Sequence, residues 1–199
     1  MKIVPSTYLP SIEIMRAIAS GDYVIDLGEH YIKRSERNRA EIMTAGGVMQ
    51  LTVNIARGNR PRTPMRQIEI DYSKRWQHQH WMAITSAYRS SPFFDYYTDE
   101  LEPFFTAKYE RLVDLNLAIT KKILQLLGLP SDLNISEEYV DAAEGDIDMR
   151  PKGVLSGRSP LTPYIQVFSD RLPYVENLSI IDLLFCEGPN AVSFILSHN

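Results

Sequence analysis

The chain has 199 residues, of which 44% are hydrophobic and 23% are charged, a composition typical of a globular protein with one substantial core. We therefore expect a single domain over residues 1–199. The one cysteine, Cys186, excludes an internal disulfide, and the first residues do not resemble a signal peptide. No apolar stretch is long enough to span a bilayer, so we expect a cytoplasmic protein. A net charge of −4 argues against a dedicated nucleic-acid-binding protein.

The first 27 residues predict a βαβ unit. Residues 2–4 and 22–27 have the composition of short buried strands, and Ser11 is a typical N-cap for a helix that ends at Gly21. The two strands should be parallel, so the loops that follow them should meet at the carboxyl edge of the sheet, where α/β proteins bind ligands. The side chains that we expect to converge at this edge are Tyr8, Asp26, His30 and Lys33.

The rest of the chain alternates between strand and helix patterns. The expected strands are 39–43 and 49–56, joined at Gly46-Gly47, then 68–70, an edge strand in 134–140, and 164–168. The expected helices are 74–90, 93–106, 108–127 and a terminal helix after Ser179, where Asp182 completes a near capping box. Residues 141–163 are rich in Gly, Ser and Pro and predict a long loop. The fold class is therefore α/β, with a mixed, mostly parallel sheet flanked by helices.

The charge of the chain is distributed unevenly. Residues 33–75 contain ten Lys or Arg and four Asp or Glu, a local balance of +6, so the remainder carries −10. Arginine dominates this basic tract, and its planar guanidinium suits phosphate and carboxylate groups. The tract therefore indicates an anionic small molecule, phosphate-bearing or nucleotide-linked, as ligand. The alternatives are pairing with the chain's own acidic residues, simple solvation, an acidic partner protein, or nucleic acid, which the net charge and the lack of motifs disfavour.

Four strong hydrogen-bonding side chains follow the second strand. They are Lys33, Arg34, Asn38 and Arg39. We expect the three cations to hold the anionic part of a substrate and Asn38 to orient it. The bend contains no Gly-rich phosphate loop, so side chains would have to supply the contacts. The alternative is a solvated turn.

The expected helix 74–90 places His80 on an inward-facing stripe with Trp76. A neutral imidazole is a suitable general base near neutral pH, so His80 and His30 are the candidate catalytic residues. The alternative for His80 is a core histidine with both nitrogens satisfied. His78 and His80 lack the i, i+4 spacing that lets two histidines on a helix share a metal, and no metal site is expected.

Asn116 lies on the apolar face of the expected helix 108–127, where its amide must find partners. It either ties down a neighbouring loop or contacts a ligand. Asp146 and Asp148 have the spacing of a metal-binding pair, but Arg150 beside them favours internal salt bridges. Cys186, at an apolar helix end, is expected to be an inert packing residue.

Several runs together give the chain a family resemblance. The most specific are Lys33-Arg34-Ser35 with Asn38-Arg39, and Leu178-Ser179-Ile180-Ile181-Asp182-Leu183-Leu184-Phe185. With Pro5-Ser6-Thr7-Tyr8, Trp76 and His80, Leu115-Asn116 and Arg150-Pro151-Lys152, they resemble WbqC-like proteins over almost the whole chain. The chain departs from that pattern at Glu36-Arg37, where the family often has Trp-His.

The resemblance implies a bacterial protein of O-antigen or surface-polysaccharide biosynthesis, of transferase type, working in the cytoplasm. Together with the basic tract, it leads us to expect an enzyme that acts on an activated sugar. The alternative is a non-catalytic binding or assembly subunit of such a pathway, and either form is compatible with a homo-oligomer.

Overall fold

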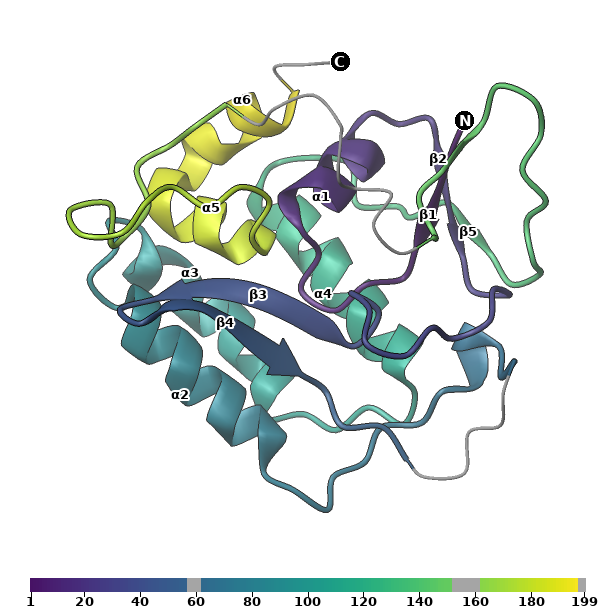
Figure 1. Ribbon diagram of the computed structural model, residues 1–199, viewed down its shortest axis with the longest axis horizontal. Helices are drawn as coiled ribbons and strands as arrows, with labels where there is room; N and C mark the ends of the chain where they lie inside the picture. Colours follow the sequence, from purple (N-terminus) through teal and green to yellow (C-terminus); the bar gives the residue numbers. More distant parts are fainter. Residues whose placement is uncertain (57–61, 152–161, 197–199) are drawn as a thin grey trace.

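The computed structural model describes residues 1–56, 62–151 and 162–196 (Figure 1). Within these ranges the main sheet has four strands in the order β5-β2-β1-β6, and every neighbouring pair is parallel. The strands are β1 (Lys2–Pro5), β2 (Tyr23–Asp26), β5 (Ile135–Ser136) and β6 (Ile147–Asp148). The α/β fold class and the predicted βαβ unit are confirmed.

Helix α1 (Ile12–Ala19) connects β1 to β2 and packs against both strands. It begins after Ser11 and buries Ile14, Met15 and Ile18, as the spacing predicts. Gly21 follows with φ of +80°, a left-handed conformation that glycine adopts without steric cost. The carboxyl ends of β1 and β2 therefore lie side by side, as expected.

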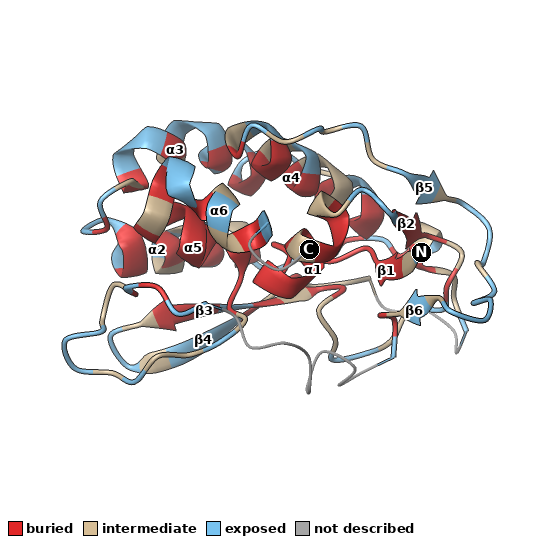
Figure 2. Cartoon of the chain, turned by 90° about the horizontal axis from the view of Figure 1, so that it is seen from above, coloured by how far each residue is buried: buried red, intermediate tan, exposed pale blue. Residues whose placement is uncertain are grey.

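Strands β3 (Arg39–Thr44) and β4 (Gly47–Thr52) form an antiparallel hairpin, as predicted, with Gly47 at φ of +99°. The hairpin is a separate two-stranded sheet and does not extend the parallel one. Ile42 and Leu51 are buried, whereas Val48, Met49 and Gln50 of β4 are exposed. Figure 2 shows the hairpin below the helices, so that one of its faces is covered and the other is open.

The helices gather around one hydrophobic core, and the core includes Trp76, Tyr88, Leu115 and Phe185. The α-helices after the hairpin are α2 (Trp76–Tyr88), α3 (Phe94–Leu101), α4 (Leu112–Leu126), α5 (Ile180–Glu187) and α6 (Ala191–Leu196). The 3-10 helices are η1 (Met65–Gln67), η2 (Glu102–Phe105) and η3 (Gly188–Asn190). The described ranges hold no helix with both the length and the apolar character needed to cross a bilayer.

Two expected strands are wrong. Ile70 bridges Ile55, but the neighbouring Glu69 bridges Arg111, so residues 68–70 share no continuous ladder with one partner. Residues 164–168 are not a strand either, because the side chain of Gln166 makes the hydrogen bonds that a neighbouring strand would otherwise make. The amide of Gln166 donates to the carbonyl of Val175 (2.8 Å) and accepts from its N–H (3.0 Å).

Two further expectations need correction. The loop predicted for residues 141–163 contains β6, which pairs with β1; residues 152–161 of that loop lie outside the described part. Ser179 is the N-cap of α5, but the capping box is wrong. Its hydroxyl donates to the carbonyl of Leu9 (2.9 Å), and the buried carboxylate of Asp182 accepts from the hydroxyls of Tyr88 and Tyr164.

Candidate functional site

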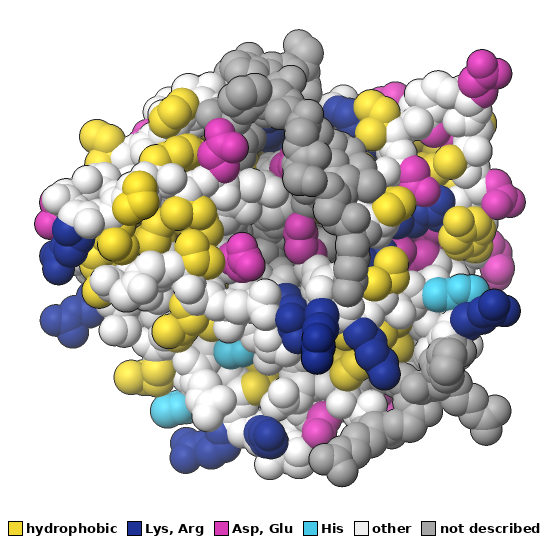
Figure 3. Space-filling view, viewed as in Figure 1, with side chains coloured by type: hydrophobic (Ala, Val, Ile, Leu, Met, Phe, Trp, Pro, Cys, Tyr) yellow, Lys and Arg dark blue, Asp and Glu magenta, His cyan; other side chains and the backbone are white. Residues whose placement is uncertain are grey.

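A cleft of about 390 Å³ opens at the carboxyl edge of β1 and β6. The loop before β3, the start of α1 and the segments 149–151 and 176–179 surround it. Its apolar lining residues are Pro5, Leu9, Ile14, Met149 and Pro151, and its charged lining residues are Arg34, Arg37, Arg39, Arg150, Glu36, Glu41 and Glu176. Figure 3 shows Lys and Arg side chains gathered near the centre of this face, over the region where β3 begins. The cleft lies at the edge that the βαβ unit predicts.

Backbone strain is concentrated at this cleft. Four non-glycine residues in the described ranges have positive φ, and three of them line the cleft, namely Leu9 (43°), Arg34 (57°) and Asn177 (56°). Most residues that carry a side chain disfavour positive φ, and they adopt it only where the surrounding structure imposes it. Their clustering is typical of a functional site.

The four arginines of the cleft fall into two classes. Arg37 and Arg150 are nearly fully buried and engaged in ion pairs. Arg34 and Arg39 make no ion pair with any described residue, and the buried Nε of Arg39 has no hydrogen-bond partner there. Arg34 and Arg39 are therefore the cations available to an anionic ligand.

The paired arginines belong to a buried network behind the cleft. Arg37 donates from Nε to Oε1 of Glu29 (2.9 Å) and from Nη2 to Oε2, and it also donates to the carbonyl oxygen of Arg150 (3.0 Å). Arg150 in turn pairs with Asp26 and with Asp148 (2.8 Å). Burial raises the pKa of Glu29 to about 7, although Arg37 opposes the shift. The Asp148–Arg150 salt bridge fits the interpretation of that pair from the sequence.

Asp26 is completely enclosed and does not line the cleft. Its Oδ1 accepts from the N–H groups of Gly28 (2.8 Å) and Glu29 (3.0 Å), and its Oδ2 accepts from Val140 (3.2 Å) and Arg150. A Cβ on Gly28 would lie 2.1 Å from the backbone nitrogen of Tyr139. Only glycine at this position therefore lets the segment around Tyr139 pack against the loop after β2. Asp26 thus positions Arg150 at the cleft wall.

Glu36 is a residue of the cleft that the sequence analysis did not select. Its Oε2 accepts a hydrogen bond from the hydroxyl of Ser11 (3.0 Å), and its carbonyl oxygen accepts from the N–H of Tyr8 (3.0 Å). Burial raises the pKa of Glu36, and Glu41 acts in the same direction. The signal in the sequence is a carboxyl between Arg34 and Arg37, close to the cations expected to bind an anion.

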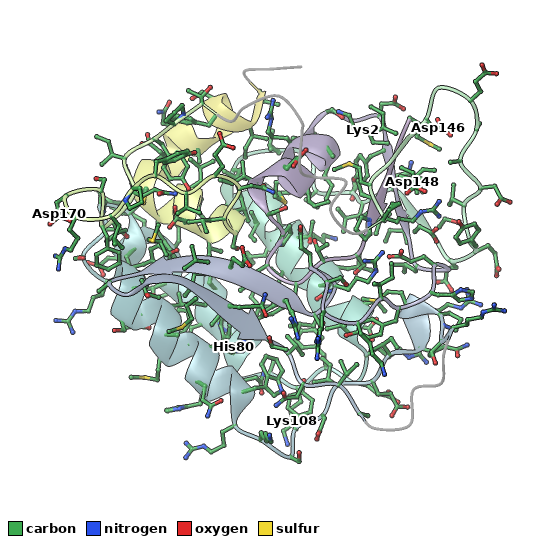
Figure 4. All side chains as sticks on the ribbon, viewed as in Figure 1. Lys2, His80, Lys108, Asp146, Asp148 and Asp170 are labelled. Atoms are coloured by element: carbon green, nitrogen blue, oxygen red, sulfur yellow. The ribbon has the colours of Figure 1, made fainter. Side chains whose placement is uncertain are left out.

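Tyr8 and His80 contact each other in the core. The hydroxyl of Tyr8 lies 2.9 Å from Nδ1 of His80, and Nε2 of His80 accepts from the N–H of Thr52 (3.1 Å). The Thr52 contact requires Nε2 to be unprotonated, so Nδ1 carries the hydrogen of the neutral ring. Burial lowers the pKa of His80 to about 4. Figure 4 shows His80 on α2 beside the end of β4, and it does not line the cleft.

The two asparagines hold main-chain segments together. Nδ2 of Asn38 donates to the carbonyl of Val53 (2.9 Å), and Asn38 lines a second, more open groove beyond the end of β4. Nδ2 of Asn116 donates to the carbonyl of Arg37 (2.9 Å) and to the hydroxyl of Ser6 (3.3 Å). Asn116 therefore ties down the loops on either side of the cleft, one of the two roles expected for it.

Lys33 and His30 are exposed and are not among the cleft-lining residues. His30 forms a bridge with Pro64. Of the nine candidate residues, the structure thus brings Arg34 and Arg39 into the cleft and places Asp26 and Asn116 directly behind it. Tyr8, His80 and Asn38 are buried in neighbouring layers. No group of His, Cys, Asp and Glu suited to a metal ion occurs among the described residues.

Sequence comparison relates this chain to known proteins. Residues 6–151, which include Arg34, Glu36 and Arg39, match the WbqC-like protein family. The chain is 30% identical over 145 residues to Uncharacterized protein Rv1507c of Mycobacterium tuberculosis (strain ATCC 25618 / H37Rv). That alignment covers 72% of this chain and 62% of the mycobacterial protein, so the chain spans less than two thirds of that relative. No solved structure matches. The chain belongs to the WbqC-like protein family.

Proposed function

We propose that this protein is a cytoplasmic enzyme of transferase type that acts on an activated sugar, or a similar anionic substrate, in O-antigen or surface-polysaccharide biosynthesis. The observation that carries the proposal is that the guanidinium groups of Arg34 and Arg39, which make no ion pair with a described residue, line a cleft at the carboxyl edge of parallel strands. Two arginines can bind a diphosphate or a carboxylate through several charge-assisted hydrogen bonds. The apolar residues that also line the cleft offer a surface to an uncharged sugar or base.

The organisation behind the cleft supports a binding role. Arg37 and Arg150 are held by buried carboxylates, so the cleft wall is rigid before a ligand arrives. Because Arg34 and Arg39 lack such partners in the described chain, a ligand does not have to break an existing ion pair to reach them. Preorganisation of this kind lowers the free-energy cost of binding.

The test is a titration of UDP-, GDP- and dTDP-linked sugars by calorimetry at low salt. We expect at least one of them to bind, and to bind about tenfold or more weakly to Arg34→Ala and Arg39→Ala, because each variant removes a charge-assisted contact. Arg89→Ala removes an exposed arginine outside the cleft and is the matched control. Lys33→Ala reports whether that neighbouring cation reaches the ligand. Absence of binding by every nucleotide sugar contradicts the proposal.

The second candidate is a non-catalytic binding or assembly subunit of the same kind of pathway. The observation that favours it is that no described lining residue of the cleft is a histidine, while His80 uses both ring nitrogens within the fold. A subunit of this kind would bind the anionic sugar without converting it. Mass spectrometry of the bound nucleotide sugar, after incubation with candidate acceptors, separates the two functions.

A further inference from the structure

Glu36 lies in the cleft together with Arg34 and Arg39, the two arginines that make no ion pair within the described ranges. It lies between Arg34 and Arg39 in the sequence, and all three line the same space. Its carboxylate is held by the hydroxyl of Ser11, and its main chain is held by the N–H of Tyr8. The loop that joins β1 to α1 therefore fixes Glu36 at two points, so its place in the cleft is built into the fold.

The surroundings of Glu36 disfavour its charge. The carboxyl is partly buried and makes no ion pair with a described residue. Its pKa is raised chiefly by burial and also by Glu41, while the hydroxyl of Ser11 and the charge of Arg37 oppose the shift. The other charged groups of the cleft are Arg34 and Arg39 on its own loop and the start of β3, Arg150 after β6, and Glu176 before α5.

We propose that Glu36 takes up a proton when an anion binds at Arg34 and Arg39, and that the protonated carboxyl donates a hydrogen bond to that anion. This inference rests on the proposed function, because it needs the anion site. A carboxylate facing a phosphate or sulfate oxygen is repelled, whereas a carboxylic acid supplies an O–H donor. In the proposed enzyme, Glu36 is then the group that holds a proton at the anionic end of the substrate.

Sulfate is the appropriate probe because it remains a dianion across neutral and mildly acidic pH. Its affinity is measured by equilibrium dialysis of labelled sulfate at constant low ionic strength, between about pH 5.5 and pH 8, where ordinary surface carboxyls stay ionised. We expect the wild-type protein to bind sulfate about three- to tenfold more tightly at the lower pH. In Glu36→Gln this pH dependence should disappear, and the affinity at the higher pH should be at least that of the wild type.

Two matched variants identify the titrating group. Glu176→Gln makes the same chemical change at an exposed position of the same cleft that does not shift the pKa of Glu36, and it should keep the wild-type pH dependence. Glu29→Gln alters the buried partner of Arg37, which lies behind the cleft. A pH dependence that survives in Glu36→Gln, or that disappears in Glu29→Gln, overturns the inference.

A measurement on the unmodified protein complements the variants. Carbon-13 NMR should show the titration midpoint of the Glu36 carboxyl moving to higher pH when sulfate is added, and an unchanged midpoint contradicts the inference. If sulfate binds and its binding depends on Arg34 and Arg39 but not on the protonation of Glu36, only this inference fails. If sulfate does not bind, or binds equally to Arg34→Ala and Arg39→Ala, the proposed anion site fails and the inference fails with it.

Discussion

Ser11 is the N-cap residue of α1, yet its hydroxyl donates a 3.0 Å hydrogen bond to Glu36 and makes no cap with its own helix. The first N–H groups of the helix are satisfied from another segment. The N–H of Ile12 donates to the carbonyl of Leu178 (3.1 Å), and that of Glu13 donates to Oδ1 of Asn177 (2.9 Å). Ser11, which the local sequence predicts to cap its own helix, therefore holds the cleft residue Glu36 in place.

Ser11→Ala and Asn177→Ala should therefore differ in stability. Ser11→Ala removes one partly buried hydrogen bond, and we expect it to lower the free energy of unfolding by about 1 kcal/mol or less. Asn177→Ala removes the cap of α1 and places alanine at φ of 56°, so we expect about 1–3 kcal/mol. Urea denaturation measures both. A larger loss in Ser11→Ala than in Asn177→Ala would contradict this assignment of the cap.

Replacing an arginine of each class should change stability by very different amounts. Arg37→Ala leaves the buried carboxylate of Glu29 without its partner, and we expect a loss of about 3–5 kcal/mol. Arg34→Ala removes an exposed cation with no ion pair in the described chain, and we expect a change within about 0.5 kcal/mol. Thermal or urea unfolding of the two variants gives the comparison. A large loss in Arg34→Ala would mark that residue as part of the scaffold.

Glu29 predicts a particular pH dependence of stability. Its pKa in the folded protein is raised from 4.5 to about 7, so between these values the folded chain keeps a proton that the unfolded chain has released. Its contribution to stability is full below the unfolded value and is lost as the pH rises through about 7. Relative to Glu29→Gln, the wild type should lose about 2–3 kcal/mol of unfolding free energy from about pH 4.5 to pH 8. A constant difference between the two proteins over this range would contradict the assignment.

His80 should remain neutral throughout the physiological range. Its pKa is lowered to about 4 by burial, and Nε2 accepts a hydrogen bond from Thr52, so the ring should be the Nδ1–H tautomer. Nitrogen-15 NMR of the imidazole resolves both the tautomer and the titration, with the exposed His78 on the same helix as an internal reference. A titration near neutral pH, or an Nε2–H tautomer, would show that His80 is available for proton transfer.

Local signals made much of the fold predictable. The apolar runs of β1 and β2, the spacing in α1 and the turn at Gly21 all act over a few residues, so the βαβ unit and its ligand-binding edge follow from the sequence. Residues 164–168 alternate like a strand, but the partner that decides their conformation is a side chain, that of Gln166. The alternating pattern of the sequence does not reveal that the Gln166 side chain, and not a neighbouring strand, makes these hydrogen bonds.

The composition of the site was less predictable because it depends on which charges neutralise one another. Arg37 pairs with Glu29 eight residues away, and Arg150 pairs with Asp26 from 124 residues away. Only the structure distinguishes these buried pairs from Arg34, although all three arginines look alike in the sequence. The same pairing explains why Asp26, expected to face a ligand, supports the cleft wall from behind.

The central claim is that Arg34 and Arg39 hold an anion in the cleft between β1, α1 and β3. Anomalous diffraction from crystals grown with selenate, a heavier analogue of sulfate, locates a bound anion directly. We predict a selenate within hydrogen-bonding distance of both guanidinium groups and beside Glu36. A crystal structure in which both arginines pair with carboxylates of this chain, and selenate binds only elsewhere on the surface, would contradict this prediction.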